Sequence, residues 1–145
     1  MDATDLAFAG AAEQARLLAA GAISAPALLE LYLDRIARLD RELRSFRIVM
    51  TEDARREAAA AQQRLDAGER LPPLGAPVAI QADSAVAGEC TCYGSSAYDL
   101  EAPADSEVVH RLRQAGAVGL GKTTGPERML WPLTETVRSG ATPNA

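Results

Sequence analysis

The side chains best suited to bond-breaking chemistry in this chain are a few hydroxyls and two nitrogen bases. A serine needs a base within hydrogen-bond reach, because its neutral hydroxyl is a poor nucleophile. The candidate bases are the only histidine, His110, and the only lysine, Lys122. His110 lies in a helical pattern and no G-x-S-x-G elbow is present, so a Ser–His–Asp site is not expected. The candidate hydroxyls in the middle of the chain belong to Ser84, Ser95, Ser96 and Ser106.

The two cysteines, Cys90 and Cys92, are separated by one residue. Such a pair rarely closes a structural disulfide, and two thiolates do not make a closed zinc site of four ligands. The sequence therefore predicts no metal site and two reduced thiols in a cytoplasmic protein.

Residues 116–123 read GAVGLGKT, which fits the phosphate-binding pattern G-x-x-x-x-G-K-[ST]. A P-loop requires a strand before its first glycine and a helix that begins at the G-K-T. Here Gly116 follows a predicted helix, and residues 117–120 read as the strand itself. P-loop-like nucleotide binding at Gly116–Thr123 remains an alternative of low weight. Otherwise Lys122 is interpreted as a partly exposed lysine at a strand end.

Composition limits the function classes. The 145 residues are enough for one domain, and the 48% hydrophobic and 24% charged residues are ordinary for a soluble protein. The net charge is −5 and the cations are scattered, which argues against nucleic-acid binding. We expect no membrane span, because no apolar run approaches about 18 residues, and no secretory signal opens the chain.

Residues 1–70 are predicted to be mainly helical. Residues 6–19 give a first helix, which Asp5 can cap. Ser24 is predicted to cap a second and more amphipathic helix. Its buried face is expected to contain the apolar residues that follow helical spacing, Leu28, Leu29, Tyr32, Leu33, Ile36 and Leu39. The short segment 46–50 is β-prone.

Thr51 is predicted to cap a third helix that ends near residue 66, and residues 71–145 read as an α/β unit. Residues 76–80 indicate a short buried strand, and residues 117–120 a second strand. Between them a fourth helix is predicted, which makes a strand–helix–strand crossover. The residues of that helix expected to face the core are Val108, Val109, Leu112 and Ala115.

At the chain end, residues 127–133 are predicted to hold one or two helical turns, and the final SGATPNA is predicted to be turn-like and loose.

Four segments carry a family resemblance. Residues 17–40, LLAAGAISAPALLELYLDRIARLD, resemble the family's usual entry, a short helix followed by a glycine, a serine cap and a long leucine-rich helix. Residues 74–96, LGAPVAIQADSAVAGECTCYGSS, resemble the first block of the amidase signature family, G-x-P-V-A-[VI]-K-D-x-x-x-V-A-G-x-x-T-x-x-G-S. Residues 103–127, PADSEVVHRLRQAGAVGLGKTTGPE, are similar to the next block of the family. Residues 129–145, MLWPLTETVRSGATPNA, look like the approach to its serine-rich loop. The resemblance covers nearly the whole chain.

This resemblance implies carboxamide hydrolysis with a Ser–Ser–Lys arrangement and no cofactor. One serine attacks the amide carbon, a second relays the proton, and a lysine is the general base. Gln81 occupies the family's lysine position, Ala82 occupies that of the following aspartate, and both family serines are expected beyond Ala145. Lys122 matches a different family position, and Ser95 matches a turn serine. No intact catalytic site is therefore expected.

The sequence thus predicts an α/β fold, the N-terminal part of an amidase-signature fold, with helices followed by a strand–helix–strand unit of an incomplete mixed sheet. We expect one partial domain over residues 1–145 that is truncated and inactive by itself, so a small amide is not expected to bind productively. The alternatives are a non-catalytic interaction module or a self-associating remnant, in which a second copy or a partner chain completes the sheet.

Overall fold

A three-stranded sheet organises the fold in a computed structural model that describes residues 2–143. The strand order is β1-β5-β2, with β1 antiparallel and β2 parallel to the central β5. These strands are Phe46–Val49 (β1), Pro77–Ile80 (β2) and Val118–Thr123 (β5). Two short antiparallel pairs lie outside this sheet: Cys90–Thr91 (β3) with Leu100–Glu101 (β4), and Glu135–Thr136 (β6) with Gly140–Ala141 (β7).

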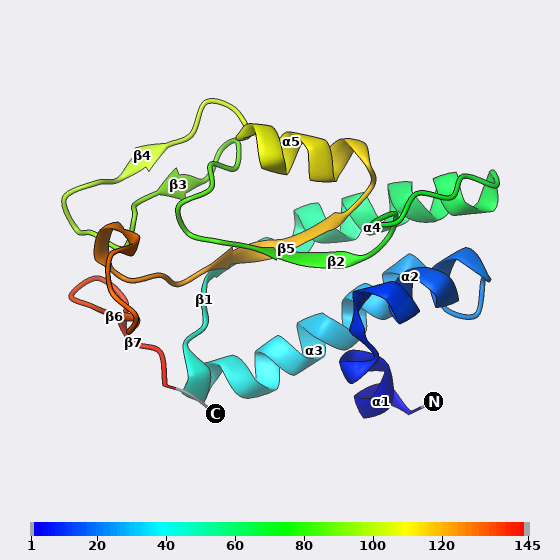
Figure 1. The fold of residues 1–145 in the computed structure, drawn as a ribbon, viewed down its shortest axis with the longest axis horizontal. Helices are drawn as coiled ribbons and strands as arrows, with labels where there is room; N and C mark the ends of the chain where they lie inside the picture. The colour runs from blue at the N-terminus through cyan, green and yellow to red at the C-terminus, as the bar shows by residue number, and fades with distance from the viewer. Residues whose placement is uncertain (1, 144–145) are drawn as a thin grey trace.

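Helices lie on both sides of the sheet, with α5 on one side and α3 on the other (Figure 1). The α-helices are Ala3–Phe8 (α1), Gly10–Ala19 (α2), Ala25–Leu43 (α3), Thr51–Asp66 (α4) and Glu107–Gln114 (α5), and a 3-10 turn, η1, spans Glu127–Met129. The α5 helix connects the parallel strands β2 and β5, so the predicted strand–helix–strand crossover is confirmed. The predicted α/β fold class with an incomplete mixed sheet is also confirmed.

The core has two parts. The larger one packs α3 and α4 against β5, and Leu28, Leu29 and Val118 are at most 1% exposed there. The smaller one consists of Met50, Ile80, Val86 and Val109. Burying a leucine or valine side chain contributes about 1.5–3 kcal/mol, so the larger cluster fixes α3 and α4 to the sheet.

Two predicted helix starts are wrong. The predicted first helix is two helices, because Gly10 adopts φ +79° and separates α1 from α2. Asp2, rather than Asp5, caps α1, since its side chain accepts a hydrogen bond from the Asp5 N–H. Thr51 is the first residue of α4 and not its cap, which is Met50. The Ser24 cap of α3 is confirmed by its bond from the Ala27 N–H at 3.2 Å.

Some predicted core positions are also wrong. Leu39 is 43% exposed and Val108 is 55% exposed, because α3 and α5 each present fewer residues to the sheet than the apolar pattern suggested. The β2 strand is an edge strand whose Ala79 is exposed, not a fully buried strand.

Part of the segment 139–145, predicted to be turn-like and loose, is paired instead. Gly140–Ala141 form β7 and pair with β6, while Asn144 and Ala145 lie outside the described residues. No helix within residues 2–143 combines the length and the apolar character needed to cross a membrane.

Candidate functional site

Gln81 immediately follows β2, so its side chain stands at the carboxyl end of an edge strand. It is exposed, and its Nε2 contacts the Sδ of Met129 at 3.9 Å. The neighbouring Ala82 is 1% exposed and has no polar side chain. An amide offers donors and an acceptor but does not exchange a proton near neutral pH. Within this pair of residues there is no general base.

Lys122 lies on β5 and is paired in register with Ile80 of β2. Ile80 is the residue immediately before Gln81. Its side chain is 0% exposed, so the expectation of a partly exposed lysine is wrong. The Nζ donates to the carbonyl oxygen of Cys90 at 3.0 Å and to Thr91 Oγ1 at 2.9 Å. The amine therefore points to β3 and is held there by two hydrogen bonds.

The Lys122–Thr91 pair has one property of an activated nucleophile. Burial and then the positive charge of Arg47 lower the pKa of the Lys122 amine, and a lysine with a lowered pKa can deprotonate a nearby hydroxyl. Thr91, however, is only 8% exposed, so a substrate has no route to the pair in this conformation. We interpret the contact as one that anchors β3 to β5.

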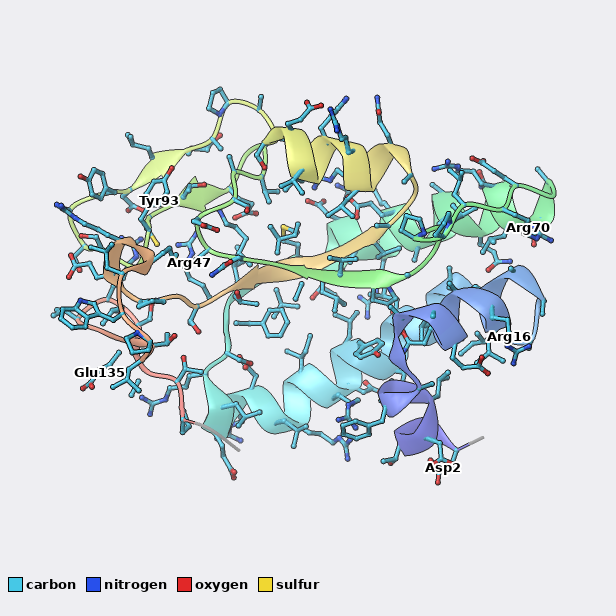
Figure 2. The ribbon with its side chains drawn as sticks, viewed as in Figure 1. Asp2, Arg16, Arg47, Arg70, Tyr93 and Glu135 are labelled. Atoms are coloured by element: carbon cyan, nitrogen blue, oxygen red, sulfur yellow. The ribbon has the colours of Figure 1, made fainter. Side chains whose placement is uncertain are left out.

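Arg47 supports the same strand from the other side. It reaches from β1 toward β3, as Figure 2 shows, and its Nη2 donates to the carbonyl oxygen of Cys90 at 2.6 Å. Two cations thus share one carbonyl oxygen. No local sequence signal identifies Arg47 or Thr91, because their partners lie 43 and 31 residues away along the chain.

Ser95 is the most buried of the candidate serines. It is 3% exposed, its Oγ donates to Glu127 Oε1 at 2.7 Å, and the Ala97 N–H donates to the same Oγ at 3.2 Å. These bonds attach the turn after β3 to η1. The pair contains neither an imidazole nor an amine, which are the bases that usually activate a serine. Ser95 therefore has the geometry of a turn residue.

The remaining candidate residues from the sequence do not come together in one site. His110 is exposed on α5, and Ser106 is the residue before that helix, so both belong to one helix end. Ser84 has a side-chain contact to its neighbour Asp83 at 3.4 Å. Residues 118–123 are extended in β5, so the GAVGLGKT segment does not form a loop between a strand and a helix.

The cysteines are both free thiols. Cys90 donates through Sγ to Asp99 Oδ1 at 2.7 Å, and burial together with this bond raises the pKa of its thiol. A raised pKa keeps the thiol protonated and weakens it as a nucleophile. Cys92 is 1% exposed.

The family model for Amidase matches residues 27–145. This chain belongs to the amidase family. The resemblance inferred from the residues is thereby confirmed.

Several curated members of the family are close in sequence. The relative named "Putative amidase AmiB2" of Mycobacterium tuberculosis (strain ATCC 25618 / H37Rv) is 62% identical over 99% of this chain and 31% of its own length. A glutamyl-tRNA(Gln) amidotransferase subunit of Salinispora tropica is 41% identical over 97% of this chain and 29% of its own length. The chain thus spans about a third of the length of these amidase-family relatives.

Solved structures agree with this placement. The native peptide amidase of Stenotrophomonas maltophilia superposes with a TM-score of 0.82 and 34% identity, over 92% of this chain and 29% of the peptide amidase. A component of a vestigial protein complex, described as revealing the evolutionary origins of an s-triazine catabolic enzyme, gives a TM-score of 0.85 at 36% identity, over 91% and 30% of the two chains. The incomplete sheet of the chain therefore corresponds to one part of a larger amidase fold.

Proposed function

We propose that this chain forms the N-terminal part of an amidase-type fold and does not hydrolyse amides by itself. The observation that carries the proposal is Gln81, which occupies the position that the family resemblance gives to the catalytic lysine. The side chain stands exposed at the end of β2 beside Met129, with no ionisable group bonded to it among the described residues. Losing a well-placed general base costs about 10²–10⁴ in rate.

The single lysine of the chain does not replace the missing base in this proposal. Lys122 lies one strand away, but both of its hydrogen bonds go to β3 and its side chain is sealed. Moving its amine to the end of β2 would break both bonds and expose the smaller core. In this proposal, the serine nucleophile that the resemblance implies has neither Gln81 nor Lys122 as its base.

A reconstitution experiment tests this proposal. The chain is mixed with a second polypeptide carrying the part of the M. tuberculosis relative outside the matched 144 residues. Size-exclusion chromatography confirms assembly, and ammonia release from small aliphatic amides reports turnover. We expect no turnover with the wild-type chain and a gain of about 10²–10⁴ with Gln81→Lys.

Two controls keep the result interpretable. Gln81→Met, which has similar size and no charge, should stay inactive in the same assembly. The relative's own N-terminal segment in place of this chain reports whether the second polypeptide is competent. Turnover by the wild-type chain, alone or assembled, that equals the Gln81→Lys value would overturn the proposal.

A second candidate function is that of an interaction module, and it is favoured by one exposed apolar segment. Leu130, Trp131, Leu133 and Val137 are each at least 70% exposed, although they are close together in sequence. Large exposed apolar patches mark interaction sites, and β2 adds an open sheet edge. We propose that a second polypeptide, or a second copy, covers these surfaces. Free thiols support a cytoplasmic location for such a complex.

Light scattering coupled to size-exclusion chromatography tests the second candidate. The wild-type chain should associate as its concentration rises, and Trp131→Glu should reduce that association. Val108→Glu is the matched control, since it is an apolar exposed residue on α5 away from the segment. A wild-type chain that elutes as a compact monomer at all concentrations would count against self-association.

A further inference from the structure

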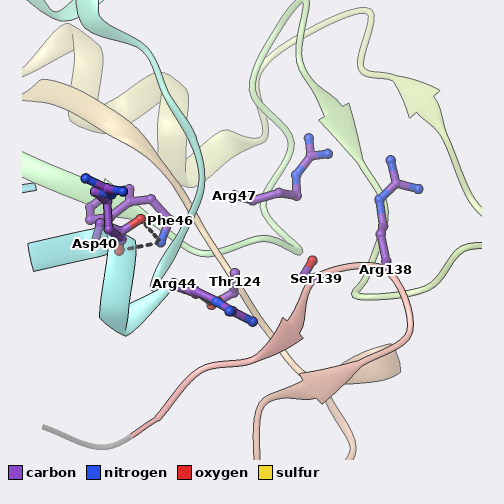
Figure 3. A pocket seen from close by; sticks show the side chains of 8 residues that line it. Asp40, Arg44, Phe46, Arg47, Thr124, Arg138 and Ser139 are labelled. Carbon is purple, nitrogen blue, oxygen red and sulfur yellow. Dashed lines mark hydrogen bonds between the residues drawn. The ribbon is translucent and has the colours of Figure 1, made fainter. Parts of the chain in front are cut away.

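A cleft of about 430 Å³ lies between the end of α3, the start of β1 and the turn between β6 and β7. Figure 3 shows its side chains, with Arg44 lower in the view and the guanidinium groups of Arg47 and Arg138 above it. Neither Gln81, at the end of β2, nor Met129 lines this cleft. The lining residues are Asp40, Arg41, Arg44, Phe46, Arg47, Thr124, Arg138 and Ser139.

Four of the eight lining residues are arginines, in a chain whose net charge is −5. Within residues 2–143, three of them, Arg41, Arg44 and Arg47, have no carboxylate within 4.0 Å. The fourth, Arg138, is paired with Asp99 at 2.8 Å. Most of the positive charge in this cleft is therefore uncompensated.

Asp40, the only acid among the described residues that line the cleft, is already occupied. Asp40 Oδ1 accepts the Ser45 N–H at 2.7 Å and also the Ser45 hydroxyl, and its two oxygens accept the Phe46 N–H at 3.2 and 3.3 Å. It thereby caps the turn from α3 into β1. Counting three unpaired guanidinium groups against this one carboxylate leaves a local charge of about +2.

Arg47 provides a second and independent observation. Its Nε is buried and has no hydrogen-bond acceptor among the described residues, although its Nη2 is bonded to Cys90. Buried donors without a partner are rare and point to a missing water or ion. The nearby Lys122 also senses this charge, since Arg47 helps to lower the pKa of its amine.

The C-terminal end of α3 explains the position of only two of the four arginines in the cleft. Arg41 lies in the last turn of α3 and Arg44 is its C-cap, where cations complement the negative end of the helix dipole. Arg47 belongs to β1, and Arg138 belongs to the turn before β7. Helix stabilisation does not account for bringing these two side chains to the same cleft.

We propose that this cleft binds a small phosphate-bearing molecule. A phosphate monoester carries about two negative charges near neutral pH, which matches the local excess of about +2. Guanidinium groups bind phosphate oxygens through paired N–H donors. Arg41 and Arg44, at the end of α3, have no carboxylate partner among the described residues, and Arg47 adds a buried Nε without an acceptor. The Ser139 side chain adds a hydroxyl, and Phe46 an apolar wall for an organic group. The volume falls within the range of small-molecule sites.

Isothermal titration calorimetry with inorganic phosphate tests the proposal, at ionic strength held constant with sodium chloride. We expect binding that saturates by about 10 mM phosphate and a parallel rise in the melting temperature. Arg44→Gln and Arg41→Gln should each weaken binding about 5-fold or more, which is within the range for losing one charge-assisted contact. Both side chains are exposed, so neither substitution disturbs the core.

Arg38→Gln is the matched control, because Arg38 is an exposed arginine on the same helix outside the cleft. It should weaken phosphate binding less than about 2-fold, the residual effect of a screened distant charge. Phenyl phosphate should bind more tightly than inorganic phosphate if Phe46 contacts the organic group.

Three results would overturn the proposal. One is the absence of any phosphate response by a chain that melts cooperatively. Another is an equal loss of binding in Arg38→Gln and Arg44→Gln, which would indicate general surface charge. The third is succinate binding as tightly as phosphate, which would show a site for carboxylates instead. Circular dichroism melts of each variant separate these results from unfolding.

Discussion

Truncating Lys122 to alanine would remove a fully buried amine together with the side chain that connects β5 to β3. Three methylenes leave the interior, which costs about 2.4 kcal/mol at about 0.8 kcal/mol each. Thr91 Oγ1 loses its donor in a nearly water-free site, which costs a further 1–3 kcal/mol or so. The substitution also removes the free-energy cost of burying the Lys122 amine, which offsets part of this sum. We expect Lys122→Ala to lower the free energy of unfolding by about 2–4 kcal/mol.

Lys122→Met separates packing from charge in the same position. Methionine retains most of the buried volume but also removes the donor to Thr91, so Lys122→Met should avoid most of the methylene cost and lower the free energy of unfolding by about 1–3 kcal/mol at most. Urea denaturation at pH 7, followed by circular dichroism, gives both values. Arg111→Ala, on the exposed side of α5, should change stability by less than about 1 kcal/mol, because its ion pair with Glu107 is exposed.

The pH dependence supplies an independent signature. The pKa of the Lys122 amine is lowered in the folded chain, so between that value and the unfolded value of about 10.4 the unfolded chain binds more protons. The stability of the wild-type chain should therefore rise relative to Lys122→Met as pH increases through this window. Two results together would refute the buried position of Lys122. One is a difference in the free energy of unfolding between wild type and Lys122→Met that stays constant from neutral pH to about pH 10. The other is a loss of less than about 1 kcal/mol of that free energy in Lys122→Ala.

Two further predictions concern the sheet and α5. Gly121→Ala should reduce stability by about 1–3 kcal/mol or more, because an added Cβ would collide with the backbone oxygen of Ile48, and thermal melts measure this loss. Asp105 binds Arg113 at 2.7 Å and accepts the Ala87 N–H at 2.8 Å. Burial raises the pKa of the Asp105 carboxyl, but these two partners outweigh burial and leave it below its ordinary value. Asp105→Asn should therefore destabilise the chain by about 1–3 kcal/mol at pH 7, and the difference from wild type should disappear as pH falls below about 4.

Local signals predicted the elements better than their ends. The Ser24 cap and the regular apolar spacing after it are properties of a few neighbouring residues, and α3 begins where they indicate. The break at Gly10 does not follow from the sequence, because an isolated glycine is also tolerated inside a continuous helix. Leu39 and Val108 are exposed although they follow the apolar spacing. Helical spacing predicts which side of a helix is apolar, but the packing against the sheet determines how many residues on that side are buried.

The orientation of Lys122 depends on a feature that no local pattern contains. Val118 and Leu120 both belong to the larger core. In a regular strand every second side chain lies on the same face, so Lys122 would also be expected on that face. The pairing with β2, however, passes from Val78–Gly119 to Ala79–Gly121, so Leu120 is skipped and the alternation shifts by one residue. Lys122 consequently takes the side of Ile80, which belongs to the smaller core, and reaches β3 instead of solvent.

The same shift separates the two positions on which the function depends. Lys122 lies on the strand next to β2 and is the only lysine in the chain, so it is the one amine that could replace a base at position 81. The bulge directs the Lys122 amine to the carbonyl oxygen of Cys90 and the Thr91 hydroxyl, where two hydrogen bonds hold it. Recruiting it as a base would require breaking those bonds, re-pairing the strands and leaving the Thr91 hydroxyl without its donor. Each step costs free energy of the order of 1–3 kcal/mol, so the exchange is disfavoured by the fold and not only by the family pattern.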